Sequence, residues 1–274
     1  MSKSESKQIF FHVGLGKTAS SYLQYKVFPY FKNIEYIHRN PRYLRAAEII
    51  AKGKSERYLI SREFDMQMER EVKKIADVYP ETKAIILFRQ HDSWIASQYR
   101  RFVKNGYTFP FNEFFNLEKD QGMFKKDNLS FYNYIKILEK HLNPKPIVLF
   151  YDDLRKDPIA FFDYIARQIG TTYNKKDISL KSKHSSYNEQ QLKAIMRVSK
   201  KIDIRRHHLK KSFYIFRRFY TNMIRYSTLY VSKYLPGSWF SNEPLIDPDY
   251  LKEVRDYYEE DYQKILEYAR KNNP

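Results

Sequence analysis

The residues best suited to chemistry stand in one short stretch, QIFFHVGLGKTASS, at positions 8–21. An apolar run leads into a turn formed by Gly14 and Gly16, and Lys17 then opens a group of hydroxyl-bearing residues. Such a turn leaves backbone N–H groups directed at one place, and the start of a following helix favours negative charge there. We therefore predict an anion-binding loop for a phosphorylated nucleotide. Its members are Gly14, Gly16, Lys17, Thr18, Ala19, Ser20 and Ser21.

The P-loop pattern G-x-x-x-x-G-K-[ST] is the obvious comparison for this stretch. Gly16, Lys17 and Thr18 fit its second half, but Phe11 stands where its first glycine belongs. The loop is therefore expected to be shorter than one that wraps a triphosphate. A plain tight turn between a strand and a helix is the alternative interpretation.

Composition sets limits on the class of protein. The chain has 274 residues, 42% of them hydrophobic, which suits one α/β domain with helical additions. It has no cysteine, so disulfides, thiolate chemistry and the usual structural zinc sites are excluded. No apolar run has the length of a spanning helix, and no signal-peptide pattern opens the chain. We expect a cytoplasmic enzyme, either soluble or peripheral at the inner membrane face.

Apolar runs alternate with segments of helical spacing. Runs at 8–13, 57–61, 83–88 and 146–151 predict parallel strands, with a weaker one at 34–38. Helices are expected at 20–31, 42–51, 66–78, 93–103, 130–141 and 158–169, the last with Asp157 as its N-cap. The prediction is an α/β fold, a doubly wound and mostly parallel sheet flanked by helices, with its ligand site beyond the carboxyl ends of the strands. The aromatic segment 106–122 is predicted to be a lid or a wall of the acceptor site.

A second anchor for an anion follows the strand at 83–88. Arg89 ends that strand, and Ser97 follows eight residues later on the next helix. An arginine can give two charge-assisted hydrogen bonds to one phosphate, and a serine adds a neutral donor. The pair gains weight because it follows a strand of the same predicted sheet as the Lys17 loop.

With these two motifs the sequence resembles the sulfotransferases that use 3′-phosphoadenosine 5′-phosphosulfate (PAPS), of the bacterial and carbohydrate type. In that family a loop with Lys-Thr-x-[ST]-[ST] binds the 5′-phosphosulfate, and a strand-end arginine with a later serine binds the 3′-phosphate. The segment YDDLRKDP at 151–158 resembles a third family signature. The resemblance covers about residues 8–170 and departs from the pattern at Gln90 and in the C-terminal third.

The resemblance implies roles for individual residues. Lys17 would stabilise the leaving product, PAP, and no metal would be required. The family uses either histidine or glutamate as the base that accepts the acceptor's proton. Glu63 is the candidate here, because it ends a strand on the edge that carries the Lys17 loop. A salt bridge to Arg62 or a helix cap is its alternative role. His12 is the second candidate, with packing in the core as its alternative role, and His91 and Asp92 come third. Lys183 and Ser186 are further candidate contacts to the nucleotide.

Positive charge gathers in the C-terminal part of the chain. The net charge is +18, and residues 181–235 carry fourteen Lys and Arg against Glu189 and Asp203. We predict an α/β core at 1–180 and a basic, aromatic helical part of the same domain at 181–274. The acceptor is expected to be a saccharide or a glycolipid. The segment 205–235 is expected to contact an acidic membrane peripherally, and a helix that packs its aromatic side chains on the core is the alternative. A P-loop kinase that uses ATP and Mg²⁺ is the alternative function. A nucleic-acid-binding protein is not expected, because no such motif stands in the basic block.

Overall fold

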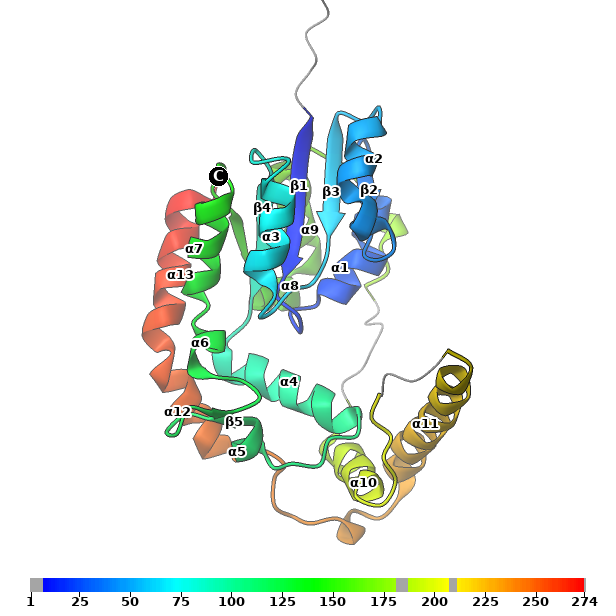
Figure 1. Ribbon diagram of the computed structural model, residues 1–274. Helices are drawn as coiled ribbons and strands as arrows, with labels where there is room; N and C mark the ends of the chain where they lie inside the picture. The colour runs from blue at the N-terminus through cyan, green and yellow to red at the C-terminus, as the bar shows by residue number, and fades with distance from the viewer. Residues whose placement is uncertain (1–6, 181–186, 207–210, 274) are drawn as a thin grey trace, which may run out of the picture. The chain divides into compact units, whose positions relative to one another are not determined.

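The computed structural model describes residues 7–180, 187–206 and 211–273. They form two compact units, one made of Met1–Gln90, Ser130–Lys183 and Tyr258–Pro274 and the other of His91–Leu129 and His184–Tyr257 (Figure 1). We call these unit 1 and unit 2. The units interleave along the chain, because α13 (Glu259–Asn272) near the C-terminus belongs to unit 1. The described helices contain no segment that is long and apolar enough to cross a membrane.

Unit 1 is built on a five-stranded parallel sheet with the order β2-β3-β1-β4-β7. The strands are β1 (Gln8–Gly14), β2 (Glu35–Ile37), β3 (Arg57–Ser61), β4 (Lys83–Phe88) and β7 (Ile147–Phe150). β3 and β4 have the predicted bounds, and the other three lie within two residues of theirs. The predicted α/β class with a mostly parallel, helix-flanked sheet is confirmed.

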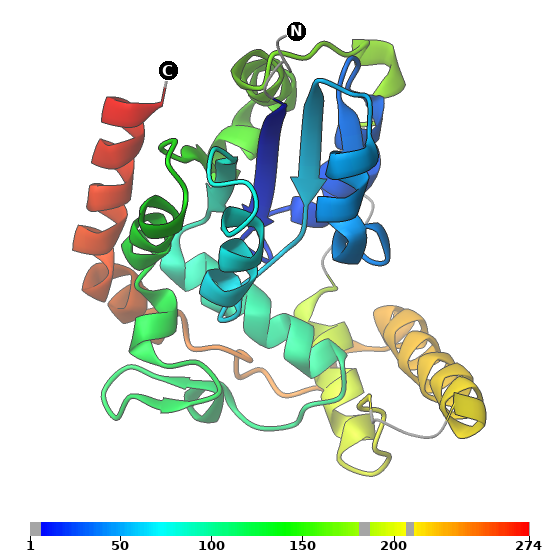
Figure 2. The same ribbon diagram turned by 45° about the horizontal axis from the view of Figure 1, so that its top comes forward.

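Both faces of this sheet are buried, as its continuous apolar strands require. On one face, Phe10 and Leu87 join a core with α1 (Ser20–Lys26) and α9 (Pro158–Gln168). On the other face, the ring of Phe11 packs against Tyr43 and Phe64. α3 (Met68–Ala76), α7 (Tyr132–His141) and α13 lie in a row in unit 1, where α7 contacts both of the others (Figure 2). Alternate residues of β1 therefore contribute to two different cores.

The predicted helices of unit 1 form with some changes at their ends. The helix predicted at 20–31 is α1, which ends at Lys26, followed by a 3₁₀ turn at Phe28–Tyr30. Pro29 lies in that turn and lacks the N–H that an α-helix needs. A 3₁₀ turn at Arg42–Arg45 and α2 (Ala46–Lys52) replace the helix predicted at 42–51. Asp157 caps α9 as predicted, since its carboxylate accepts the N–H of Ala160 at 3.0 Å. β7 gives way at Tyr151 to a helix that was not predicted, α8 (Tyr151–Lys156).

Unit 2 is mainly helical. Its helices are α4 (His91–Lys104), α5 (Phe111–Phe114), α6 (Lys126–Leu129), α10 (Glu189–Ser199), α11 (Lys211–Val231) and α12 (Pro248–Tyr257). A short hairpin, β5 (Phe115–Asn116) with β6 (Gln121–Gly122), lies within the segment predicted to be a lid or wall. Phe111, Phe114 and Phe115 of that segment are buried, and the first two pack on Tyr99. These three aromatic side chains therefore serve the core of unit 2.

Candidate functional site

Three strands bring the candidate residues to one edge of the sheet in unit 1. β1, β3 and β4 are neighbours and parallel, so the loop after β1 and the segments after β3 and β4 begin at the same edge. The chain after β3 stays beside β1, because Arg62 donates its N–H to the carbonyl of His12 and Phe64 to that of Val13, both at 2.9 Å. Residues 62–65 therefore run alongside the loop at 14–21. Ligands of open α/β sheets bind at such an edge, where the strand order reverses.

The loop itself has an unusual backbone. Gly14 has a φ of 118°, and a Cβ there would lie 3.1 Å from the backbone N and O of Phe64, so only glycine fits. Lys17 and Ala19 each have a φ of 66°, which is uncommon for residues with a side chain. Leu15 anchors the loop by donating its N–H to the carbonyl of Leu87 on β4 at 3.1 Å. Left-handed residues in a loop of this kind turn backbone N–H groups toward a common concavity that suits an anion.

The hydroxyl groups of the loop have two different surroundings. Thr18 and Ser20 are buried, and both hydroxyls donate to the carbonyl of Leu15, at 2.6 and 2.8 Å. Ser21 is exposed and donates to Oε1 of Glu63 at 3.0 Å. The first two hydroxyls thus hold the shape of the loop, and their residues can meet a ligand through backbone N–H groups. Since α1 has only seven residues, the loop matters more here than the helix dipole.

Arg89 reaches the same loop from the end of β4. Its Nη1 lies 3.4 Å from the carbonyl oxygen of Lys17, and its guanidinium carbon lies 4.6 Å from the ring centre of Tyr151. A guanidinium stacks well on an aromatic face and keeps its edge for hydrogen bonds. Lys17 and Arg89 are both partly exposed, so two cations stand at this loop.

Asp65 is a member of the site that the sequence analysis missed. Its Oδ1 accepts the N–H of Gly16 at 3.0 Å, so a carboxylate holds one donor of the loop. The position of Asp65 in the sequence could have indicated it, because Asp65 comes two residues after Glu63, at a strand end that was already predicted to belong to the site. The motif at residues 14–21 does not itself indicate an acidic residue beside an anion-binding loop.

The two candidate bases have opposite environments. His12 is fully buried, with Nδ1 2.7 Å from Oγ of Ser61 and its ring against Phe28. Burial lowers the pKa of His12 to about 3, so its imidazole is neutral at physiological pH. These contacts favour the packing role that was its alternative. Glu63 is partly exposed at the edge of the loop, beside Ser21.

Three of the five further candidates belong to α4 of unit 2, and the other two are not described. Ser97, on α4 of unit 2, is half-buried. His91 and Asp92 begin the same helix and are buried, and Asp92 forms an ion pair with Arg255 at 2.6 Å. Lys183 and Ser186 lie outside the described residues. Among the residues that are described, no group of three or more His, Asp or Glu side chains is arranged to hold a metal ion.

Comparison with known proteins gives a structural match only. No protein-family model matches the chain, and no curated protein matches it in sequence. A solved sulfotransferase from Alicyclobacillus acidocaldarius matches with a TM-score of 0.51 and 13% identity, over 70% of this chain and 92% of that one. The chain has the fold of that sulfotransferase. At this identity the match concerns the fold, and the chemistry must be argued from the site.

Proposed function

We propose that this protein is a sulfotransferase that moves the sulfuryl group of PAPS to a hydroxyl or amine of an acceptor. The observation that carries the proposal is the meeting of Arg89 with the Lys17 loop within unit 1. A donor with two separated phosphate groups needs cations at two points, and the two motifs supply one each. The fold shared with a solved sulfotransferase supports the same class of reaction.

The residues around the loop fit the donor's 5′-phosphosulfate in charge and in donor type. Lys17 supplies a positive charge where negative charge develops on the leaving phosphate, which is the main way such transfers are accelerated. The backbone N–H groups of residues 18–21 complete this half of the site. Arg89 binds the 3′-phosphate, with Ser97, Lys183 and Ser186 as further proposed contacts. No metal ion is assigned a role.

Glu63 is the proposed general base. As the acceptor oxygen bonds to sulfur and the bond from sulfur to the phosphate oxygen breaks, the acceptor's proton passes to the Glu63 carboxylate. His12 is the weaker candidate because its ring is buried and neutral. The hydrogen bond from Ser21 holds Glu63 at the rim of the loop.

The proposed acceptor is a saccharide or a glycolipid, and the proposed location is the cytoplasm, with the enzyme peripheral at the membrane. Exposed tyrosines suit stacking on sugar rings, and the basic part of the chain suits an anionic acceptor.

The test first compares candidate nucleotides for binding and then searches for the sulfate acceptor. PAP in the presence of a chelator is expected to raise the melting temperature, whereas ATP with Mg²⁺ is not. Labelled sulfate should then pass from PAPS to members of a panel of saccharides, glycolipids and phenols. Stabilisation by ATP with Mg²⁺ alone would favour the kinase alternative and overturn the proposal.

A further inference from the structure

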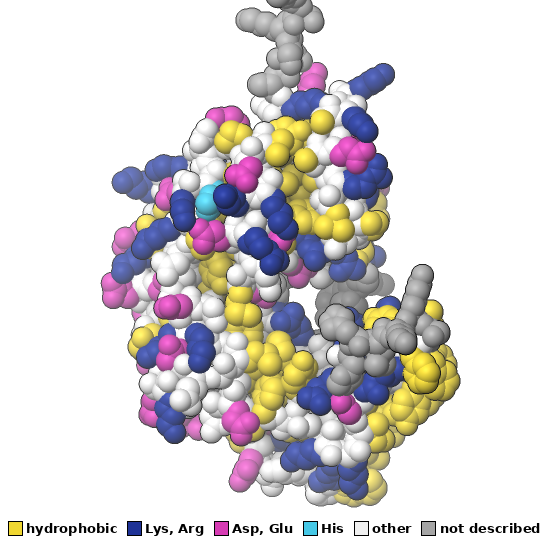
Figure 3. All heavy atoms as spheres, viewed as in Figure 1, with side chains coloured by type: hydrophobic (Ala, Val, Ile, Leu, Met, Phe, Trp, Pro, Cys, Tyr) yellow, Lys and Arg dark blue, Asp and Glu magenta, His cyan; other side chains and the backbone are white. Residues whose placement is uncertain are grey.

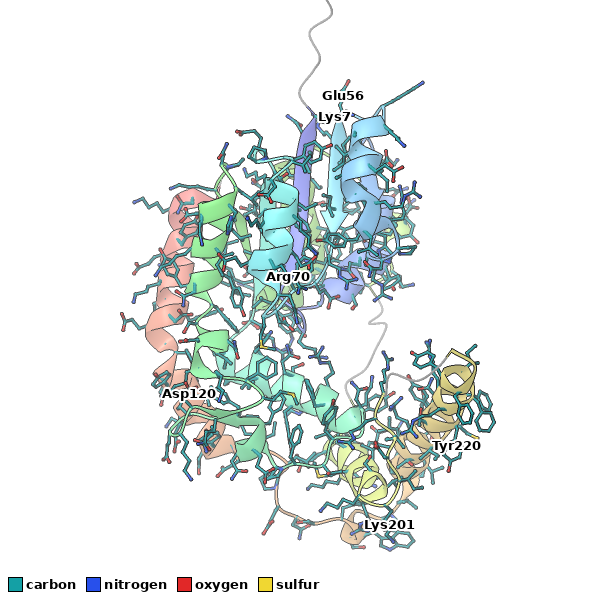
Figure 4. The ribbon with its side chains drawn as sticks, in the orientation of Figure 1. Lys7, Glu56, Arg70, Asp120, Lys201 and Tyr220 are labelled. Atoms are coloured by element: carbon teal, nitrogen blue, oxygen red, sulfur yellow. The ribbon has the colours of Figure 1, made fainter. Side chains whose placement is uncertain are left out.

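Helix α11 presents its apolar side to solvent. Phe213, Phe216 and Phe219 are 73%, 72% and 69% exposed. Figure 3 shows hydrophobic side chains gathered along the helix, and Tyr220, labelled in Figure 4, belongs to this exposed set. The remaining exposed members on or just after α11 are Ile215, Met223, Tyr226, Tyr230, Val231 and Tyr234. We call this set the aromatic face. Groups of large apolar side chains that are exposed together mark interaction sites on proteins.

The side of α11 that packs against the rest of unit 2 is largely polar. Thr221 and Arg225 are buried there, together with Leu229. The Arg225 guanidinium donates to the carbonyls of Lys104 and Ile204, at 3.1 and 2.7 Å, and to the Asn222 side chain. A surface helix normally buries its apolar side and solvates its polar side. In α11 that arrangement is reversed, so the aromatic face is not explained by the packing of this unit.

Positive charge surrounds the helix. Residues 204–240 contain eight Lys and Arg and no Asp or Glu: Arg205, Arg206, Lys210, Lys211, Arg217, Arg218, Arg225 and Lys233. All five of these arginines line one small hollow beside α11: Arg205, Arg206, Arg217, Arg218 and Arg225. Burial and the charges of Arg225 and Arg206 lower the pKa of the neighbouring Lys104 ammonium. Cations that crowd one another in this way attract a surface of negative charge.

We propose that the aromatic face of α11 and its surrounding arginines dock on a bilayer surface that carries anionic lipids. Charge decides between a bilayer and a second copy of the chain, because a second copy would bring the same group of arginines to the interface and the two groups would repel each other. Aromatic residues and arginine are the side chains that suit the boundary between headgroups and acyl chains. Trp239, which follows α11 in the chain, is a further exposed aromatic residue, at 60%.

This docking leaves the helix lying in the interface. α11 has 21 residues but carries three arginines, and no described helix meets the requirements for spanning a bilayer. Helices of this type bind through apolar area together with attraction to anionic lipids. The inference does not rest on the transferase activity, since it concerns a different surface in unit 2.

The test is flotation of the full chain with vesicles. We expect it to float with vesicles of phosphatidylcholine and phosphatidylglycerol, less at high salt, and not with phosphatidylcholine alone. The double variant Phe216→Ser/Phe219→Ser should lower binding about tenfold or more, and Arg218→Glu should lower it too. The matched control Leu44→Ser/Val78→Ser changes two exposed apolar residues of unit 1, 72% and 54% exposed, and should bind as the wild type does.

Oligomeric state and folding complete the test. Circular dichroism and melting temperature should be the same in all variants, because the altered side chains are exposed. Failure of the wild type to float, equal binding to both kinds of vesicle, or equal loss in the control would each overturn the proposal. A wild-type dimer that the Phe216→Ser/Phe219→Ser variant converts to monomer, without flotation, would make a second copy the occupant and overturn it as well.

Discussion

Nη1 of Arg89 lies 3.4 Å from the backbone carbonyl oxygen of Lys17, although 72 residues separate them in the chain. This contact joins the end of β4 to the loop after β1, two neighbouring strands of the sheet. The stacking of Arg89 on Tyr151 adds the start of α8 to the same group. Two cationic motifs that the sequence could only place on neighbouring strands are therefore in direct contact.

Lys17→Ala is expected to lower turnover about 100-fold or more, because it removes the charge that stabilises the leaving phosphate. Lys17→Arg, which keeps the charge and changes its geometry, should lose less. Initial rates of sulfate transfer at saturating PAPS give the measurement. Turnover of Lys17→Ala within threefold of the wild type would remove Lys17 from the proposed mechanism.

Arg89→Gln is expected to weaken PAP binding about 10- to 100-fold, the range for losing a charged hydrogen-bond donor. AMP, which lacks the 3′-phosphate, should bind wild type and variant with similar affinity. Calorimetric titration of both nucleotides measures this difference. If the variant weakened AMP as much as PAP, Arg89 would act on the loop rather than on the 3′-phosphate.

Much of the fold of unit 1 could be predicted because its signals are local. The apolar runs at 57–61 and 83–88 have the same bounds as β3 and β4. A strand that is buried on both faces is apolar along its whole length, so the ends of the run mark the ends of the strand. The early end of α1 depends on Pro29, and the start of α8 depends on packing around Tyr151. The spacing of apolar residues along the sequence indicates neither.

The site was harder to predict than the fold for a different reason. Motif spacing indicated that Thr18 and Ser20 belong to the loop, yet their hydroxyls donate to the carbonyl of Leu15. Which atoms of a loop residue are available depends on backbone dihedrals, and the left-handed Lys17 and Ala19 carry no sequence signal. The contact of Asp65 with the loop depends on the direction that the chain takes after β3, which the sequence does not indicate.

Glu63→Gln is expected to lower turnover about 100-fold or more while leaving PAP affinity unchanged, because the amide keeps the shape of the side chain but cannot accept the proton. Glu56→Gln is the matched control. Glu56 is exposed just before the opposite end of β3 and is labelled in Figure 4. Rates and PAP titrations should be measured on both variants. An active Glu63→Gln enzyme would assign the base to another residue.

The buried imidazole of His12 should make stability depend on pH. Its pKa in the folded protein is about 3, below the 6.5 of an exposed histidine, so only the unfolded chain takes up this proton between those values. Stability is therefore full above pH 6.5 and falls as pH is lowered toward 3, by at most about 1.4 kcal/mol per pH unit. His12→Asn, which can still bond to Ser61, should lose less stability than the wild type between pH 7 and pH 5, measured by urea unfolding. Equal losses in wild type and His12→Asn would show that His12 is protonated in the folded protein.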